Sequence, residues 1–241
     1  MSKPVYIIKL GTTFDFLVPE YGDFDAWTAR VLAPGGLACQ SIDAEHAEPL
    51  PDPADCAAAV LTGSHRMITD QEPWSQAVQH WLAGLLDQEI PILGICYGHQ
   101  LLAQAAGGHV AYHPRGREIG TVQVHTRPEC AGDPLFSSIS NPFYAHTAHS
   151  QSVISLPPGA VHLAENKYEP HHAFRIGRSA WGVQFHPEFT TDIMRAYILE
   201  QRSELQAGQR DIDPLLKTVR ATPQAAQIAA LFATYVQIHD H

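Results

Sequence analysis

The sequence predicts an α/β protein with an open, mostly parallel sheet and helices on both of its faces. Three observations support this fold class. Short apolar runs alternate with amphipathic segments through the first half of the chain, as expected of parallel strands joined by helices. These runs lack polar alternation, which is typical of strands buried on both faces. The second half changes to alternating patterns, which predict antiparallel strands that extend the sheet.

The first elements follow one another closely from the N-terminus. Val5–Leu10 is a largely apolar run that predicts a strand, ended by the Gly-Thr-Thr segment behind it. Asp23–Leu32 predicts a helix with an apolar face, and Asp23 is a suitable N-cap. The other elements of this half are a strand at 37–42, a strand at 57–61 and a helix that begins at Pro73.

The next segment is the one around which the chain is organised. A strand at Ile90–Ile95 and a helix at Leu101–Ala106 flank a turn that holds Cys96 between Gly94 and Gly98. A sharp strand-to-helix turn that presents a nucleophile needs small neighbours, because bulky ones would collide where the backbone doubles back. A cysteine at a helix N-terminus is also favoured as its thiolate. The pattern therefore predicts a reactive cysteine.

After this turn the pattern becomes β-rich and then helical. The predicted strands lie at 118–126, 143–146, 160–164, 173–176 and 180–185. The predicted helices follow from Thr190, with segments at 193–199, 215–219 and 225–236. We expect one domain over residues 1–200, and a helical appendage of residues 201–241 packed on or beside it.

Composition narrows the function classes. The chain has 241 residues, 45% of them hydrophobic and 17% charged, as in an ordinary globular protein. Its net charge of −10 argues against a nucleic-acid or anionic-membrane partner. The apolar run near the N-terminus is too short for a signal peptide or a membrane span. The four cysteines show no CxxC pairing, which favours a reduced, cytoplasmic protein and leaves a disulfide open.

A base for the cysteine is also present. His186 follows the apolar strand at 180–185, so its ring should emerge at the carboxyl end of that strand. In an open α/β sheet this is the edge where ligands bind, and the same edge presents Cys96. Glu188 lies two residues further on, and Pro187 stiffens the link between them. We therefore expect Glu188 to hold the imidazole in the tautomer that a base needs.

These residues resemble those of a known family. Gly94–Gln100 (Gly-Ile-Cys-Tyr-Gly-His-Gln) and Gln184–Glu188 (Gln-Phe-His-Pro-Glu) are similar to motifs of the class I, or triad, glutamine amidotransferases. Within that family the glutaminase domain of GMP synthase and its free-standing relatives look most similar. The resemblance covers roughly Val5–Phe189. Three further segments, at 61–64, 116–120 and 149–153, resemble less specific motifs of the family and follow one another in the order that the family has.

The resemblance implies a flavodoxin-like sheet and a Cys96–His186–Glu188 triad. The Cys96 thiolate would attack the side-chain carboxamide of glutamine, or another γ-glutamyl carbonyl, to form a thioester. The backbone N–H groups of Tyr97 and Gly63 would bind the oxyanion, at about 3 kcal/mol for each donor. Residues 1–200 would then be the amidotransferase domain.

The resemblance also implies which residues bind substrate. Gln100 matches a position that touches glutamine, and His149, Ser150 and Gln151 match a loop that reads its amino-acid end, largely through backbone. Two departures concern this pocket. Gln151 stands where an aspartate is common, and Ser64-His65 stands where relatives often have Gly-Pro. Arg117 and Glu118 receive no role.

Three functions remain open on the sequence. The first is a glutaminase or amidotransferase subunit whose ammonia acceptor is a separate synthetase chain, since the sequence has no Walker A pattern and no Ser-Gly-Gly-x-Asp-Ser loop. The second is a hydrolase or peptidase of γ-glutamyl conjugates that transfers no ammonia. The third is a non-catalytic regulatory binder of the same fold, against which the intact Cys, His and Glu set argues.

We predict no cofactor and no metal. The histidine pairs His146/His149 and His171/His172 are able to bind metals, but no second carboxylate or cysteine cluster completes a site at a recognisable spacing. We expect Cys39, Cys56 and Cys130 to be small buried residues without a chemical role, because the family that the sequence resembles assigns them none.

Overall fold

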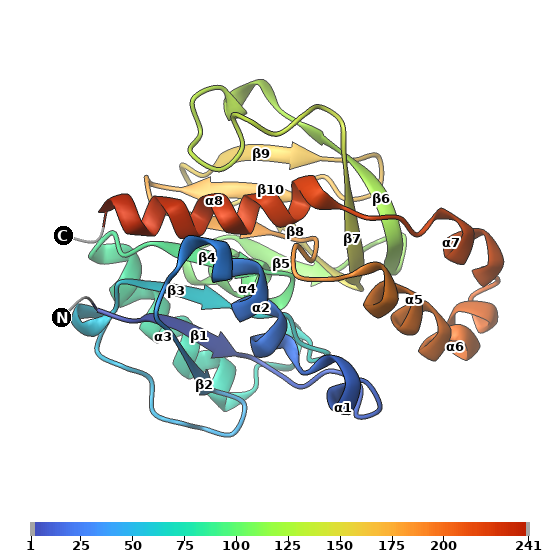
Figure 1. Ribbon diagram of the computed structural model, residues 1–241, viewed down its shortest axis with the longest axis horizontal. Coiled ribbons are helices and arrows are strands. Elements are labelled where there is room, and N and C mark those ends of the chain that lie inside the picture. The colour runs from blue at the N-terminus through green and yellow to red at the C-terminus, as the bar shows by residue number, and fades with distance from the viewer. Residues whose placement is uncertain (1–2, 240–241) are drawn as a thin grey trace.

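The computed structural model describes residues 3–239 and contains a twisted sheet with helices on both faces (Figure 1). The strands run across the main sheet in the order β2-β1-β3-β4-β11-β10-β9-β6-β7, and β5 pairs with β8 in a separate small sheet. Their bounds are β1 (Val5–Lys9), β2 (Cys39–Asp43), β3 (Ala58–Leu61), β4 (Ile92–Ile95), β5 (His109–Tyr112), β6 (Glu118–Thr126), β7 (Phe143–His149), β8 (Gln151–Ser155), β9 (Val161–Glu165), β10 (Ala173–Ile176) and β11 (Ala180–Val183).

The sheet has a parallel half and an antiparallel half. Strands β2, β1, β3, β4 and β11 pair in parallel, whereas β10, β9, β6 and β7 continue the sheet through antiparallel pairs. This confirms the predicted fold class, a flavodoxin-like open sheet with an antiparallel extension. The order also makes β11 the neighbour of β4, with Val183 opposite Ile95, so two strands far apart in sequence end side by side.

Three of the helices begin where capping chemistry predicts. The Asp23 carboxylate accepts a hydrogen bond from Phe24 N, the Thr190 hydroxyl accepts one from Ile193 N, and Pro73 occupies the first helical position. The bounds are α1 (Val18–Tyr21), α2 (Phe24–Leu32), α3 (Pro73–Asp87), α4 (Tyr97–Ala105), α5 (Thr191–Glu200), α6 (Arg202–Ala207), α7 (Ile212–Thr218) and α8 (Pro223–His239).

The central strands are buried on both faces, as their continuous apolar runs predict. Side chains alternate along a strand, so Val60 of β3 joins the core beneath α8 while its neighbour Leu61 joins the core beneath α3 and α4. In β4, Leu93 joins the core beneath α8 and Ile92 joins the core beneath α3 and α4. The strand that leads into the turn at Cys96 is therefore held by packing on both faces of the sheet.

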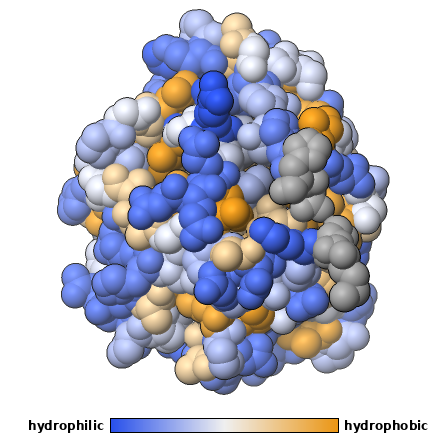
Figure 2. Space-filling view, turned by 90° about the vertical axis from the view of Figure 1, so that its left-hand side faces the viewer, coloured by the Kyte–Doolittle hydropathy of each residue, from blue (hydrophilic) through white to orange (hydrophobic). Residues whose placement is uncertain are grey.

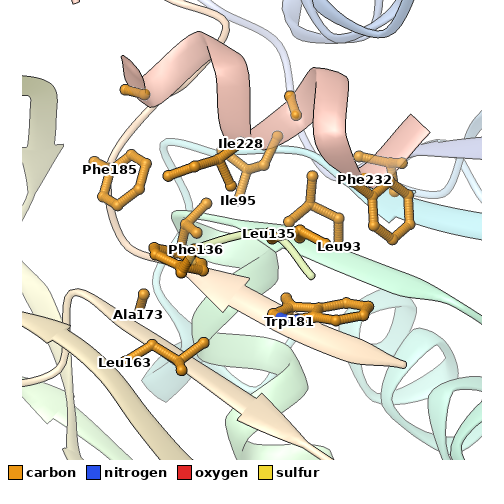
Figure 3. Packing of buried hydrophobic residues seen from close by; sticks show 14 of the residues in the cluster. Leu93, Ile95, Leu135, Phe136, Leu163, Ala173, Trp181, Phe185, Ile228 and Phe232 are labelled. Atoms are coloured by element: carbon orange, nitrogen blue, oxygen red, sulfur yellow. The ribbon is translucent and has the colours of Figure 1, made fainter. Parts of the chain in front are cut away.

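The C-terminal helix α8 belongs to the first of these cores. It crosses one face of the sheet (Figure 1), and Ile228 and Phe232 point from it toward the sheet residues Ile95 and Trp181 (Figure 3). The rings of Phe232 and Trp181 meet edge to face with centroids 6.2 Å apart. The boundary that we place between residues 200 and 201 remains a prediction.

We expect Phe232→Ala to lower the free energy of unfolding by about 3–5 kcal/mol, because it removes a fully buried ring and leaves a cavity. Urea denaturation followed by circular dichroism measures the change. Ile238→Ala on the same helix is the matched control, since Ile238 is 61% exposed and should change stability little. A loss below about 1 kcal/mol for Phe232→Ala would show that α8 does not stabilise the sheet.

Some sequence predictions about elements are wrong. The segment His149–Gln151 is not a loop, because His149 ends β7, Gln151 begins β8 and only Ser150 lies between them. Strands β5 and β8 were not predicted, since their exposed and buried residues alternate too irregularly for a clear pattern. Helix α4 begins at Tyr97, which confirms the predicted position of Cys96 at a helix N-terminus and places the first turn of the helix before the segment 101–106.

The outer surface is mostly polar on the side of the molecule that lies at the left in Figure 1. Hydrophilic residues dominate that face, and apolar residues form small separate groups between them (Figure 2). Among the helices within residues 3–239, none is long and apolar enough to cross a membrane.

Candidate active site

Cys96 sits on a strained turn between β4 and α4. Its φ of +52° and ψ of −100° are rare for a residue with a side chain, and such strain is concentrated at functional sites. Its backbone N–H donates to the Val183 carbonyl of β11 at 2.9 Å, which ties the turn to the neighbouring strand. The side chain is 5% exposed.

The flanking glycines confirm that this turn requires small neighbours. A Cβ on Gly94 would lie 2.5 Å from the Gly98 carbonyl oxygen. A Cβ on Gly98 would lie 2.5 Å from the Leu61 Cβ and 2.6 Å from the Leu61 carbonyl oxygen. The two glycines thus let α4 begin directly against the ends of β3 and β4.

His186 follows β11 and so reaches the same edge of the sheet as Cys96. Its backbone N–H donates to the His146 carbonyl at 2.8 Å, and its Nδ1 lies 2.7 Å from Glu188 Oε1. Both side chains are almost fully buried. The ring lies between Phe24 and Phe189, with centroids 6.3 Å and 4.0 Å away and nearly parallel planes. These contacts leave Nε2 as the ring nitrogen free to exchange a proton.

The charge on His186 is set by its neighbours. Burial alone would lower the pKa of His186, but the Glu188 carboxylate and the adjacent Cys96 raise that pKa to about 10. The geometry thus supports a charged pair between His186 and Glu188.

This pairing predicts a pH dependence of stability. The pKa of His186 is about 10 when folded and 6.5 in the reference state, so its stabilising effect is complete below pH 6.5 and is lost as pH rises through 10. We expect Glu188→Gln to unfold more readily at pH 6 and to show a flatter decline between pH 6.5 and 10. Urea denaturation at several pH values measures the stability at pH 6 and its decline toward pH 10, and Glu200→Gln changes an exposed carboxylate as the control. Parallel pH curves for wild type and Glu188→Gln would contradict the pairing.

Two backbone N–H groups, one directly after Cys96 in the chain and one beside the His186 ring, have no hydrogen-bond acceptor among the described residues. Within residues 3–239, neither the Tyr97 N–H at the start of α4 nor the Gly63 N–H after β3 donates a hydrogen bond to another protein group. A Cβ on Gly63 would lie 2.9 Å from His186 Cε1 and 3.2 Å from Phe24 Cε1, so the imidazole position itself requires glycine there. These groups are suitable donors for a developing oxyanion.

A cavity of about 210 Å³ opens above Cys96. This is smaller than the 300–1,000 Å³ or so of pockets for drug-sized ligands, and it suits a compact molecule such as an amino acid. Tyr97, Gln100, His149, Ser150 and Gln151 also line it, so the structure brings together the residues expected to bind substrate.

The side chains of two of these residues, Gln100 and Gln151, are held by protein groups. Gln100 Nε2 donates to the Gln151 carbonyl at 2.8 Å and to Gln184 Oε1 at 2.9 Å. The side chain of Gln151 accepts from Ile68 N at 2.9 Å and donates to Thr69 Oγ1 at 2.7 Å. Gln151 therefore fixes the wall of the pocket, where an aspartate could not make the second of these bonds.

His149 belongs to a buried cluster behind the pocket. Glu118 Oε2 lies 3.2 Å from His149 Nε2 and 3.3 Å from His172 Nε2, and Asn166 Nδ2 donates to Glu118 Oε1 at 2.9 Å. Burial alone would raise the pKa of Glu118, but the hydrogen bond to His149 and the adjacent His172 ring hold that pKa far below its ordinary value. In the described part of the chain, no group of three or more His, Cys, Asp or Glu residues is arranged to hold a metal ion.

Two walls of the cavity extend beyond the residues that were expected to bind substrate, although the departure at Ser64-His65 already pointed to one of them. One is aromatic: His65 packs on Phe14 at 4.4 Å and its Nε2 lies 3.2 Å from the Tyr197 hydroxyl. Burial lowers the pKa of His65 to about 4, with smaller contributions from the charges of His186 and Arg117. The His65 ring is therefore neutral at pH 7. The other wall is polar and contains Arg117, Gln201 and Glu204.

The features described so far define a class of protein: an open α/β sheet with a cysteine on a strand-to-helix elbow and a His–Glu pair on the adjacent strand end. The family profile "Glutamine amidotransferase class-I" matches residues 68–204, which is more than half of the chain. The chain belongs to the class-I glutamine amidotransferase family.

Curated relatives carry the name glutamine-hydrolysing GMP synthase. The chain is 36% identical over 171 residues to that of Thermus thermophilus, covering 68% of this chain and 32% of the relative. It is 37% identical over 126 residues to that of Marinobacter nauticus, covering 48% of this chain and 23% of the relative. The chain therefore spans about a third or less of the length of these relatives.

Solved structures share the fold over nearly the whole chain. A glutamine amidotransferase from Methylobacillus flagellatus superposes with a TM-score of 0.78 at 24% identity, covering 99% of this chain and 95% of that one. A glutamine amidotransferase from Thermotoga maritima has a TM-score of 0.78 at 21% identity, and the match covers 98% of this chain and 100% of that one.

Proposed function

We propose that this chain hydrolyses the side-chain amide of glutamine through a γ-glutamyl thioester on Cys96, with His186 and Glu188 completing a catalytic triad. The observation that carries the proposal is the placement of Cys96 on a strained elbow beside a buried His186–Glu188 pair with a contact of 2.7 Å. Family membership supports glutamine as the substrate.

Acylation begins from the Cys96 thiolate and the His186 imidazolium. The thiolate attacks the side-chain carbonyl carbon of glutamine, and the oxygen takes up negative charge. Tyr97 N–H and Gly63 N–H stabilise that charge, at about 3 kcal/mol for each donor. The imidazolium then protonates the leaving nitrogen, the C–N bond breaks, and ammonia departs from the thioester.

Deacylation reverses the role of His186. Now neutral, it removes a proton from a water molecule, and the resulting hydroxide attacks the thioester carbonyl. The same two N–H groups stabilise the second oxyanion. Its collapse breaks the C–S bond, releases glutamate and restores the thiolate–imidazolium pair. Glu188 keeps the proton on Nδ1 throughout, so that Nε2 faces the reacting atoms.

The ammonia would pass to an acceptor on a separate synthetase chain. This part of the proposal follows from the relatives, which combine a matching segment with a much longer protein named for GMP synthesis. The experiment is to measure glutamate and ammonia released from L-glutamine by the purified chain, alone and with any protein that co-purifies from the native cell. Absence of Cys96-dependent glutamate release under both conditions would overturn the proposal.

The aromatic wall favours a second candidate, hydrolysis of γ-glutamyl conjugates. Phe14, His65 and Tyr197 stand on the side of the cavity where His186 protonates the leaving group: Tyr197 packs at 4.8 Å on Phe189, which stacks on His186. Departing ammonia makes no use of such a wall, whereas a bulky apolar amine would pack on it. A kcat/KM at least tenfold higher for γ-glutamyl anilides or peptides than for L-glutamine would favour this candidate.

A further inference from the structure

A second cavity, outside the catalytic one, carries an excess of positive charge. It has a volume of about 400 Å³ and is lined by the turn before β6, the loop after β9, helix α6 and the segment between α6 and α7. Three arginines line it, Arg115, Arg117 and Arg210, against one carboxylate, that of Glu204. Because Arg117 and Glu204 also line the cavity above Cys96, the two cavities adjoin at these two residues.

One of the three arginines is paired with a carboxylate, and the other two are not. Arg117 Nη1 lies 2.7 Å from Glu204 Oε2. Among residues 3–239, neither Arg115 nor Arg210 forms an ion pair with a carboxylate. The whole chain has a net charge of −10, so two unpaired guanidinium groups in one cavity reverse the overall charge locally. Like charges in one cavity repel each other, and an anion bound between them would remove that repulsion.

Both unpaired guanidinium groups lie near the same side chain. Burial raises the pKa of Tyr168, and the positive charges of Arg210 and Arg115 oppose that rise. The guanidinium carbon of Arg115 lies 4.3 Å from the centre of the Tyr168 ring. The two charges, which are 95 positions apart in the sequence, therefore converge on one part of the cavity.

Backbone carbonyls hold these guanidinium groups in place without neutralising them. Arg115 Nη2 donates to the Lys167 carbonyl at 2.6 Å and to the Tyr168 carbonyl. Arg210 Nη1 donates to the Arg117 carbonyl at 2.6 Å. Within the described part of the chain, their other guanidinium N–H groups donate no hydrogen bond. A fixed guanidinium with unused N–H donors is suited to bind an oxyanion.

The space beside Arg115 is open. The next residue, Gly116, has a φ of +85°, and a Cβ built there would meet no atom within 4 Å. Arg115 itself is exposed and Arg210 is half-buried, so a ligand can reach both from solvent. A phosphate group carries up to two negative charges and three acceptor oxygens, which matches two guanidinium groups better than the single charge of a carboxylate does.

We propose that Arg115 and Arg210 form a binding site for a phosphate group, either inorganic phosphate or the phosphate of a small ester. Arg117 stays paired with Glu204 and separates this site from the catalytic cavity. The ligand is chemically distinct from a γ-glutamyl compound, and the site does not depend on the proposed hydrolysis.

Calorimetry with inorganic phosphate tests the site directly. At low ionic strength, where charge attraction is least screened, the wild type should bind one phosphate saturably. Arg115→Gln and Arg210→Gln should each raise the Kd at least fivefold. Arg202→Gln, which changes an exposed arginine of α6 that does not line this cavity, should change it less than twofold.

Thermal melts without phosphate identify variants that fail to fold, and Arg115→Gln changes an exposed residue that should fold normally. Added phosphate should raise the melting temperature of the wild type more than that of Arg115→Gln, because only a ligand that binds the folded state stabilises it. Absence of saturable phosphate binding by the wild type, or an unchanged Kd in folded Arg115→Gln, would overturn the proposal.

Competing ligands identify the source of the phosphate. Glycerol 3-phosphate that binds at least tenfold more tightly than inorganic phosphate would support an ester as the ligand, and equal affinities would support inorganic phosphate. Acetate that binds as tightly as phosphate would overturn the proposal, because the site would then not select a phosphate group. A triglutamate peptide that binds more tightly than both phosphate compounds would overturn it in favour of an acidic protein segment.

Discussion

Cys96→Ala is expected to abolish release of glutamate from L-glutamine, with kcat reduced about 10⁴-fold or more while the fold is retained. The Cys96 sulfur is the only protein atom proposed to bond to the substrate carbon, so no residual triad chemistry remains. Ala keeps the Cβ, and the elbow is held by the close approach of Gly94 and Gly98 and by the hydrogen bond from residue 96 N–H to Val183. Rapid-quench or coupled glutamate assays measure the loss, and circular dichroism checks the fold.

A matched control is available on another cysteine. Cys39 in β2 is partly exposed, and burial raises the pKa of its thiol, so Cys39→Ala should leave turnover unchanged. A glutamine-analogue diazoketone should label wild type and Cys39→Ala with one adduct and leave Cys96→Ala unlabelled. Full turnover by purified Cys96→Ala would contradict the proposed mechanism, and unlabelled wild type would revive the non-catalytic binder.

The sequence contained enough to predict the parallel half of the fold and the approach of Cys96 to His186. Both follow from local patterns: apolar strands, a glycine-flanked turn, and the rule that parallel strands present their carboxyl ends at one edge. The structure adds that Gly63 is required by the position of the His186 ring, a steric fact that no spacing in the sequence expresses.

The two walls of the cavity could not be predicted in this way. Arg117 and Glu204 are 87 residues apart, and their contact depends on how α5 and α7 pack against β6 and so position α6, for which the sequence shows no periodic signal. The interaction of His65 with Tyr197 spans 132 residues and has the same origin. Strand β8 was missed because the buried polar side chains of Gln151 and Ser152 hide its strand character, and these serve hydrogen bonding rather than apolar packing.

His186→Ala is expected to lower kcat about 10³-fold or more, since general acid–base catalysis and the charge that favours the Cys96 thiolate are lost together. The ring lies between Phe24 and Phe189, so its removal leaves a slot that added imidazole fits. We therefore expect added imidazole to restore part of the turnover of His186→Ala, in proportion to the neutral imidazole concentration.

The comparison between variants separates a chemical role of His186 from a structural one. Imidazole should not rescue Cys96→Ala, because that variant lacks the atom to be activated, and His80→Ala on the exposed face of α3 should need no rescue. Glu188→Gln should retain more activity than His186→Ala, since it keeps the base and loses only the charge that orients it and raises its pKa. A His186→Ala protein that folds, turns over L-glutamine at the wild-type rate and ignores imidazole would remove His186 from the mechanism and leave Cys96 without a base.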